Sequence, residues 1–362
     1  MMPEPKTLVP PDAALRIIAD DLTGALDSAA PFSSPMHPVH VSFSWRGPLS
    51  GARLSISTDS RDLAVDISTQ RVAQMTRNQL SAAPMGALWF KKVDSVLRGH
   101  PVEETLAVFR AAAFSHLVFA PAYPGLGRVT VKGRQHVVEP HGGQLRPVGP
   151  DLAVAFAMAG LTIATKPTTS VDTGSVIILD ANTQDELSLQ VEQWRSVLPD
   201  TALWAGAGGL ALALGGGRSA VVFPDLAQVL VGTRHPVTQA QVEHLAGRRG
   251  GQMPQAPEIF YPAFHSASPE ETAVALAERC QAMDPVQLAG RSVLVVGGDT
   301  LATVMRAVEA EHLVCLGEAA PGVAVSRIAG GRWSGISLLS KSGGFGARDL
   351  LHRLAGLPPG GP

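Results

Sequence analysis

The stretch RIIADDLTGALDSA (residues 16–29) joins a short apolar run to a helical pattern through two adjacent acidic residues. The apolar run Leu15–Ala19 has the length and composition of a buried parallel strand. Thr23 and Gly24 then open a helix. A strand that leads directly into a helix is the basic unit of an α/β fold, and in open α/β sheets ligands bind at the carboxyl ends of the strands. This stretch therefore predicts the fold class and one position where function resides.

The same alternation continues along the chain and predicts an α/β protein. Further strands are expected at 54–58, 87–93, 116–120, 176–179, 203–205, 226–231, 259–261, 292–296 and 335–339. Helices are expected between them at 70–80, 103–113, 184–197, 238–245, 269–282 and 300–310. We predict two α/β domains with largely parallel sheets flanked by helices.

Two Gly-rich stretches divide the chain. GGGRSAVVFPD (215–225) is typical of a linker, so we predict domains at 1–225 and 226–362. GRRGGQMPQAPE (247–258) is expected to be a surface loop of the second domain. The segment 121–150 is rich in Gly, Pro, Arg and His and has little periodicity. We expect it to be a long loop with a function, because long loops in compact domains are usually functional.

Composition excludes several classes of protein. Hydrophobic residues make up 45% of the 362 residues and charged residues 17%, which indicates well-buried cores rather than disorder. The net charge of −2 gives no sign of nucleic-acid or membrane partners. Two cysteines are too few for a disulfide framework or a cysteine-based zinc site. Because the N-terminus also lacks a signal-peptide pattern, we expect a cytoplasmic protein.

Asp20 and Asp21 form the first candidate site. Paired carboxylates at a strand end can accept hydrogen bonds from polyol hydroxyls, hold a cation or deprotonate a hydroxyl. The alternative is helix capping, since Asp and Thr are good N-cap residues. One cap accounts for only one of the two acids, so the position favours a functional role.

Two further predicted strands end in polar residues. STDSR (57–61) places Asp59 and Arg61 either in a surface ion pair or in the same crevice, where arginine can bind a carboxylate bidentately. In KKVDSVLRGH (91–100), Gly99 permits close approach of the backbone to a ligand. The polar residues of this stretch are Lys92, Asp94, Ser95 and Arg98. A cleft that combines such acids and cations suits a small hydroxylated acid.

Three Gly-containing turns follow predicted strands in the second half: VLVGTRHPVTQAQ (229–241), VLVVGGDT (293–300) and SKSGGFGARDLL (340–351). Glycines at such turns allow backbone N–H groups and a helix N-terminus to face phosphate. Neither a P-loop nor a well-placed G-x-G-x-x-G is present, so an ordinary nucleotide fingerprint is missing. Three such turns together favour nucleotide binding.

Taken together, these motifs resemble those of the four-carbon acid sugar kinases, which use ATP to phosphorylate erythronate, threonate or 3-oxo-tetronate at the terminal hydroxyl. The motifs occur in the family's order: IADDLTGALD (18–27), KKVDSVLRGH (91–100), APAYPGLGRVTVKG (120–133), GAGGLALAL (206–214), VGTRHPVTQAQ (231–241), VGGDT (296–300), PGVAVSR (321–327) and KSGGFGARDLL (341–351). The resemblance implies an N-terminal domain for the acid sugar, a C-terminal domain for ATP, and an active site in the cleft between them.

Carried over motif by motif, the resemblance implies two sets of site residues. The substrate set is Asp20, Asp21, Asp59, Arg61, Ser95, Arg98 and Gly99. The nucleotide set is Thr233, Gly297, Gly298, Asp299, Thr300, Gly343 and Gly344. The chain departs from the family at Val96, where Thr is usual, at Gly344, where Asn is usual, and at Thr233, where Ser is usual. These departures leave the substrate open.

Our hypothesis is an ATP- and Mg²⁺-dependent kinase in which Asp20 or Asp21 acts on the attacking hydroxyl. Arg61 or Arg98 would bind the substrate carboxylate. Lys341 or Arg234 would neutralise phosphate charge, and no side chain is assigned as a direct metal ligand. Two alternatives are a non-catalytic sugar-acid binding protein or sensor and an NAD(P)-dependent hydroxy-acid dehydrogenase. The expected partners are the sugar acid and ATP, and a homo-oligomer is left open.

Overall fold

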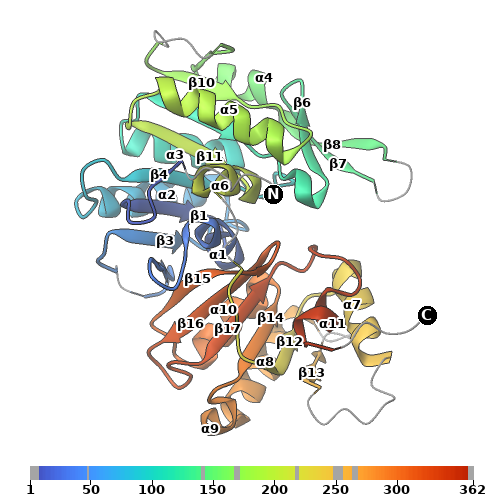
Figure 1. The fold of residues 1–362 in the computed structure, drawn as a ribbon. Coiled ribbons are helices and arrows are strands. Elements are labelled where there is room, and N and C mark those ends of the chain that lie inside the picture. Colours follow the sequence, from blue (N-terminus) through green and yellow to red (C-terminus); the bar gives the residue numbers. More distant parts are fainter. Residues whose placement is uncertain are drawn as a thin grey trace, which may run out of the picture. The chain divides into compact units, whose positions relative to one another are not determined.

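The computed structural model describes residues 8–46, 49–139, 143–166, 172–216, 220–247, 256–262 and 268–357. The chain divides into two compact units, one of Met1–Ser33 and Val39–Arg218 and the other of Ser34–Pro38 and Ser219–Pro362 (Figure 1). Each unit contains a sheet flanked by helices, which confirms the predicted α/β fold. Among the described helices, none is both long enough and apolar enough to cross a lipid bilayer.

The main sheet of the first unit contains parallel strands in the order β2-β3-β1-β4-β11-β5-β10-β9. Their bounds are β1 Leu15–Ala19, β2 Val39–Ser42, β3 Arg53–Ser57, β4 Leu88–Lys92, β5 His116–Ala120, β9 Thr162–Ile163, β10 Ser175–Ile178 and β11 Ala202–Gly206. The central strand β1 ends at Ala19, level with Ser57 of β3 and Lys92 of β4. The residues that follow these three strands therefore emerge at one edge of the sheet.

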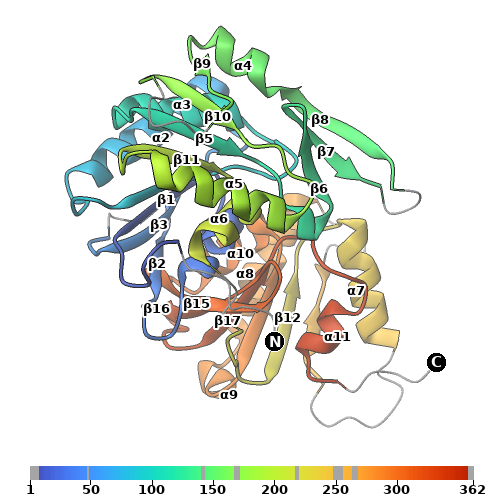
Figure 2. The same ribbon diagram turned by 45° about the horizontal axis from the view of Figure 1, so that its top comes forward.

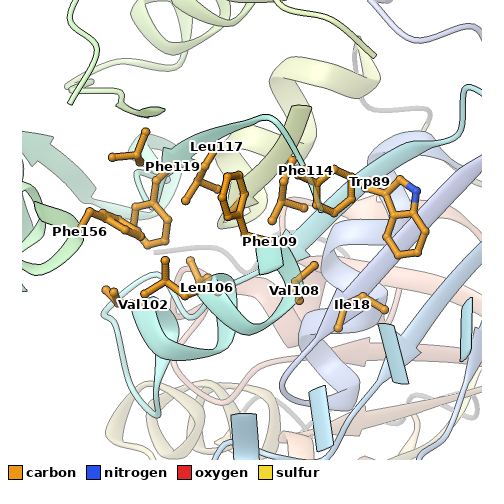
Figure 3. Close-up of a cluster of buried hydrophobic side chains, with 14 of the residues drawn as sticks. Ile18, Trp89, Val102, Leu106, Val108, Phe109, Phe114, Leu117, Phe119 and Phe156 are labelled. Atoms are coloured by element: carbon orange, nitrogen blue, oxygen red, sulfur yellow. The ribbon is translucent and has the colours of Figure 1, made fainter. Parts of the chain in front are cut away.

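The helices of the first unit are α1 Leu22–Ala29, η1 Ala30–Phe32, α2 Val65–Leu80, α3 Pro101–Ala111, α4 Leu152–Met158, α5 Gln184–Val197 and α6 Gly208–Gly215. One hydrophobic cluster joins the sheet to α2, α3 and α4 (Figure 3). In it, Phe119 of β5 meets Phe156 of α4 edge-on, with ring centroids 4.9 Å apart. Apolar side chains on both faces of the strands explain why these segments are continuous hydrophobic runs in the sequence.

The segment 121–150 is not the long loop that we expected. It contains η2 Pro124–Leu126 and most of a separate antiparallel sheet of β6 Arg128–Val131, β7 Arg134–Val138 and β8 Leu145–Asp151 (Figure 2). Lys132 and Gly133 both have positive φ, 51° and 69°, and join the paired residues Val131 and Arg134. This is the geometry of a two-residue hairpin turn. The Lys-Gly pair was the overlooked signal.

The sheet of the second unit has the strand order β13-β12-β14-β17-β16-β15. Its strands are β12 Leu226–Val231, β13 Glu258–Phe260, β14 Ser292–Val296, β15 His312–Ala320, β16 Val323–Ala329 and β17 Ser337–Lys341. The strands β13, β12, β14 and β17 are parallel, whereas β15 and β16 form an antiparallel hairpin beside β17. The hairpin was not predicted.

The helices of the second unit are α7 Pro236–Gly247, α8 Pro269–Ala282, α9 Pro285–Leu288, α10 Gly298–Ala307 and α11 Leu350–Leu354. A hydrophobic cluster joins α7 and α11 to one face of the sheet. Strand β17 begins two residues later than the expected 335–339, because Gly335 has a φ of 86° and belongs to the preceding turn. Parts of the predicted linker at 215–225 and of the predicted loop at 247–258 lie outside the described residues.

Candidate functional site

Asp20 and Asp21 follow β1 directly and have different surroundings. Asp21 is the N-cap of α1: its Oδ1 accepts a hydrogen bond from the Gly24 N–H at 2.8 Å, and its Oδ2 accepts one from the Thr23 hydroxyl at 2.8 Å. A Cβ at Gly24 would lie 2.4 Å from Asp21 Oδ1, so glycine is needed for this cap. Capping therefore accounts for Asp21 but leaves Asp20 to a different partner.

That partner is Arg61, on the turn after β3. Its Nε and Nη2 donate to the two carboxylate oxygens of Asp20 at 2.6 and 2.9 Å, and its Nη1 donates to Asp21 Oδ2 at 2.7 Å. Burial alone would raise the pKa of Asp20, but the charges of Arg61, Lys91 and Lys92 hold it well below its usual value. One guanidinium thus binds both acids.

Backbone hydrogen bonds place this turn against the end of β1. The N–H of Thr58 donates to Ala19 O at 2.8 Å, and the N–H of Ser60 donates to Asp20 O at 3.0 Å. Asp59 has a φ of 51° and an exposed side chain, while its carbonyl accepts a bond from Arg71. The ion pairs of Arg61 are with Asp20, Asp21 and Asp94.

A buried ion pair lies beneath the same turn. Lys91 Nζ lies 2.8 Å from Glu104 Oε2, and these side chains are 0% and 1% exposed. Glu104 Oε1 accepts hydrogen bonds from the hydroxyls of Ser60 and Ser68 at 2.6 and 2.5 Å. Lys91 Nζ also donates to the carbonyl of Lys92 at 2.8 Å. The ends of β3 and β4 are therefore joined through α2 and α3.

The loop after β4 is organised by Asp94. Its Oδ1 accepts from the N–H of Val96 at 2.9 Å, and its Oδ2 accepts from Arg98 Nη2 at 2.6 Å. Burial would raise the pKa of Asp94, but its hydrogen bond with Arg98 and the charge of Arg61 lower it. Gly99 has a φ of 72°, and a Cβ there would lie 3.1 Å from the carbonyl oxygen of Arg61. Gly99 thus permits contact with the neighbouring loop.

Ser95 lies within this loop and is buried. Its carbonyl accepts a hydrogen bond at 2.7 Å from the side chain of Gln135 on β7, and Gln135 Oε1 accepts from the Thr130 hydroxyl at 2.6 Å. The separate antiparallel sheet therefore fixes the backbone of a predicted substrate residue. No local sequence pattern indicated this role of Gln135.

Lys92 is the cation that the predicted site set omitted. It ends β4, is 5% exposed, and its Nζ would lie 3.3 Å from a Cβ at Gly24. Its charge acts on both Asp20 and Asp94, yet no described residue forms a hydrogen bond or ion pair with its Nζ. Arg61 and Arg98, in contrast, are bound to acids of their own. The stretch 91–100 contained the signal, because Lys92 was already among its polar residues.

In the second unit, the ends of β12, β14 and β17 bring the predicted nucleotide residues together. A Cβ at Gly297 would lie 2.9 Å from the hydroxyl oxygen of Thr300 and 3.3 Å from Thr233 Cβ. A Cβ at Gly343 would lie 2.8 Å from the hydroxyl oxygen of Thr233. Gly298 and Asp299 begin α10, and Gly344 lies beside the ring of His235. Glycines therefore keep three turns close around two threonines.

Helix α7 supports the Gly-rich turn after β17. The Thr238 hydroxyl donates to Gly343 O at 2.7 Å. The buried side-chain amide of Gln241 donates to the carbonyls of Phe345, Gly346 and Ala347 at 3.0, 3.0 and 2.9 Å. Sequence reasoning missed both residues, because no local pattern links α7 to a turn about 100 positions later.

Within the described ranges, no group of three or more His, Cys, Asp or Glu side chains is arranged to hold a metal ion. The three turns instead offer backbone N–H groups and the start of α10. Such a set suits phosphate oxygens, because anions bind at helix N-termini and in backbone N–H concavities.

Two family models match the chain. One describes a sugar-binding N-terminal domain and matches residues 15–149, and the other describes a nucleotide-binding C-terminal domain and matches residues 266–351. The first range contains the Arg61 cluster and the loop after β4. The second contains the turns after β14 and β17.

Named relatives cover the chain to different extents. D-threonate kinase of Bordetella bronchiseptica is 29% identical, over 94% of this chain and 96% of that protein. D-threonate kinase of Cupriavidus necator is 27% identical over 65% of this chain and 64% of that protein. D-erythronate kinase of Heliobacterium modesticaldum is 34% identical over 32% of this chain and 28% of that protein.

Solved structures share the fold. A Salmonella typhimurium protein has a TM-score of 0.68 at 19% identity, covering 94% of this chain and 98% of that chain. A Haemophilus influenzae protein has a TM-score of 0.63 at 17% identity, covering 94% of this chain and 99% of that chain. At these identities the likeness concerns the fold alone.

Proposed function

The chain belongs to the family of four-carbon acid sugar kinases, and from this premise we propose that it uses ATP to phosphorylate the terminal hydroxyl of a four-carbon sugar acid. Erythronate, threonate and 3-oxo-tetronate are the substrate types considered. The names of the D-threonate and D-erythronate kinases among its relatives support this class. The observation that carries the proposal is Lys92, a cation that forms no ion pair with any residue the structure describes and lies beside two acids held by one arginine.

Lys92 is our proposed ligand for the substrate carboxylate. Arg61 and Arg98 already donate to Asp20, Asp21 and Asp94, so binding the carboxylate through either arginine would disturb an existing ion pair. Lys92 can bind an anion without disturbing an ion pair between described residues. A hydrogen bond between charged groups is stronger than one between neutral groups, which suits recognition of a small acid.

Asp21 is our proposed contact for the attacking hydroxyl, in preference to Asp20. Asp20 is bound bidentately and its side chain is 6% exposed, whereas that of Asp21 is 18% exposed. Burial would raise the pKa of Asp20, but the charge of Arg61 lowers it below its usual value. This low pKa also makes Asp20 a poor proton acceptor. Since phosphoryl transfer depends mostly on positioning and electrostatics, orienting the hydroxyl would be the main task of Asp21.

The turns after β12, β14 and β17 are our proposed nucleotide site, through Thr233, the Gly297–Thr300 turn and the Gly343–Gly344 turn. The close approach of these glycines to Thr233 and Thr300 supports the proposal, because side chains there would fill the space beside the backbone N–H groups. Mg²⁺ bound with ATP would neutralise phosphate charge, and Asp299 at the exposed start of α10 would be its protein contact.

A coupled kinase assay with D- and L-erythronate, D- and L-threonate and the 3-oxo-tetronates tests the proposal. We expect ATP consumption that depends on at least one of these acids and on Mg²⁺. Absence of turnover with every acid would reject it.

Two further measurements separate the alternatives. A binding protein or sensor would bind the sugar acid in calorimetry but not a nonhydrolysable ATP analogue. A hydroxy-acid dehydrogenase would be stabilised against heat by NAD(P)H but not by Mg-ATP.

A further inference from the structure

Lys341 is the last residue of β17 and one of the most deeply buried charged residues in the second unit. It is 1% exposed, and its Nζ has no hydrogen-bond partner among the described residues. Within β17 it lies two positions after Leu339, so both side chains point to the same face of the sheet. That face carries the hydrophobic cluster that α7 and α11 cover.

The strand neighbours of Lys341 offer nothing polar to its amine. In register, Lys341 lies beside Val296 of β14 and Val323 of β16, and both valines belong to the hydrophobic cluster. A buried amine without a partner destabilises a folded protein, because its charged form loses water without compensation. Burial accordingly lowers the pKa of Lys341 to about 7.

Charged and titratable groups lie on the turns, helices and strands of this unit that adjoin β17. They are Arg234 and His235 after β12, Glu243 and His244 on α7, Asp299 on α10, the buried Glu318 on β15, Arg327 on β16, and Arg348, Asp349, His352 and Arg353 in and before α11. None of them contributes to the shifted pKa of Lys341, for which burial is the cause. Within the part of the second unit that the structure describes, the amine therefore has no counter-ion.

The position of Lys341 suggests what its counter-ion is. Its carbonyl accepts a hydrogen bond from the N–H of Gly297 at 2.9 Å, so the two Gly-containing turns after β14 and β17 begin beside it. Both turns approach Thr233 closely, because Gly297 and Gly343 have no side chains that would collide with it. A cation at the base of such a set of backbone N–H groups is suited to a multiply charged anion.

We propose that the ε-amino group of Lys341 is a ligand of the nucleotide phosphates and takes up a proton when they bind. The inference rests on the proposed function, since the phosphates belong to the ATP of that reaction. It decides between Lys341 and Arg234, the two cations expected from the sequence to neutralise phosphate charge, and it adds the uptake of a proton. A neutral, buried lysine becomes useful in this way, because the incoming anion supplies the charge that the folded chain does not.

Lys341→Met separates this role from a purely structural one. Methionine has nearly the same shape and no amine, so it should fit the apolar surroundings of Val296 and Val323 and raise the melting temperature. A structural lysine would give the opposite result, with lower stability. Arg332→Gln, which removes an exposed cation elsewhere in the same unit, is the charge-matched control.

Calorimetry with a nonhydrolysable ATP analogue and Mg²⁺ provides the first test. We expect Lys341→Met to bind at least tenfold more weakly than wild type, while Arg332→Gln binds normally and both variants remain folded. Equal affinity of Lys341→Met and wild type would overturn the assignment while leaving the kinase proposal intact. If the wild type bound neither the analogue nor inorganic tripolyphosphate, both proposals would fall.

Proton uptake by the wild type provides the second test and needs no substitution for its main signal. Repeating the titration at pH 8 in buffers of different ionisation enthalpy should reveal uptake of close to one proton per nucleotide, roughly the amount expected for an amine that is neutral before binding. Lys341→Met should lose most of this uptake, while any share from His235 should remain. Unchanged uptake in the variant would refute a role for Lys341.

Discussion

Arg61 binds Asp20 through two parallel hydrogen bonds, from Nε to Oδ2 at 2.6 Å and from Nη2 to Oδ1 at 2.9 Å. Its third contact, with Asp21, means that a single guanidinium sets the separation of the two acids. Lysine cannot reproduce this planar geometry. Replacing Arg61 would therefore change the positions of the two acids as well as their electrostatic surroundings.

We therefore expect Arg61→Lys to lower kcat/KM for the sugar acid by about 100-fold, as misplaced catalytic groups typically do. Steady-state kinetics with the best acid of the substrate panel provide the measurement. Arg98→Lys is the matched control, because the Arg98 side chain is 59% exposed and its ion pair with Asp94 is correspondingly weak. Equal losses in both variants would contradict a special role for Arg61.

Lys92→Met should raise the KM for the sugar acid by about tenfold to 100-fold, since a hydrogen bond to a charged group contributes about 1.5–3 kcal/mol. The KM for ATP should change little, because Lys92 belongs to the other proposed site. Lys132→Met, which removes an exposed lysine from the β6–β7 turn, should leave both values unchanged. A Lys92 variant with normal KM for the acid would return the carboxylate to Arg61 or Arg98.

Asp20 should make the protein sensitive to acid. Its pKa in the folded protein lies below the ordinary value of 3.8, so the unfolded chain takes up the proton first as pH falls. The stabilisation is fully present above pH 3.8 and is lost progressively below it. Urea unfolding of Asp20→Asn between pH 2 and 6 should show a shallower loss of stability at the acid end. A slope equal to that of wild type would contradict the assignment.

Lys341 should make the free energy of unfolding depend on pH between about pH 7 and 10.5. With a pKa of about 7 in the folded protein and 10.5 ordinarily, the unfolded chain binds more protons between these values. The free energy of unfolding should therefore rise with pH across this window, by about 1.4 kcal/mol per pH unit from this group. Lys341→Met should remove that contribution, as chemical denaturation at several pH values would reveal.

Glu104→Gln should destabilise the first unit by about 3–5 kcal/mol, because it leaves the charge of Lys91 buried without its counter-ion. The double variant Lys91→Met with Glu104→Leu removes both charges and should recover much of the loss. Chemical denaturation of the single variants Lys91→Met and Glu104→Leu and of their double variant measures this coupling. Additive losses would indicate that the ion pair is not coupled.

The pattern of strand and helix could be predicted where local signals are strong. β1, β5, β12 and β14 have the predicted bounds, as do α5 and α8. Both of those helices begin with a capping box, Thr183 with Glu186 and Ser268 with Glu271, so their starts are encoded within four residues. The parallel strands that lead into the predicted substrate loops were equally clear, as uninterrupted apolar runs.

Other features depend on pairing between distant segments. Burial alternates along the first six residues of β15, but their sequence HLVCLG has no matching alternation of polar and apolar residues. The 121–150 segment forms strands because they pair with one another. The sequence pattern predicted that Asp20, Asp21 and Arg61 follow strand ends at one edge of the sheet, but it did not indicate that they bind each other. The supports from Gln135 and Gln241 come from long-range contacts, which no window of sequence contains.

Gly99 has a consequence for attempts to change the substrate of this protein. Because a Cβ there would press on the backbone of Arg61, the loops after β3 and β4 constrain each other's shape. Residues 57–61 and 94–99 should therefore be exchanged together when the site is engineered. A loop grafted from a relative with another specificity should function only when its partner is grafted with it.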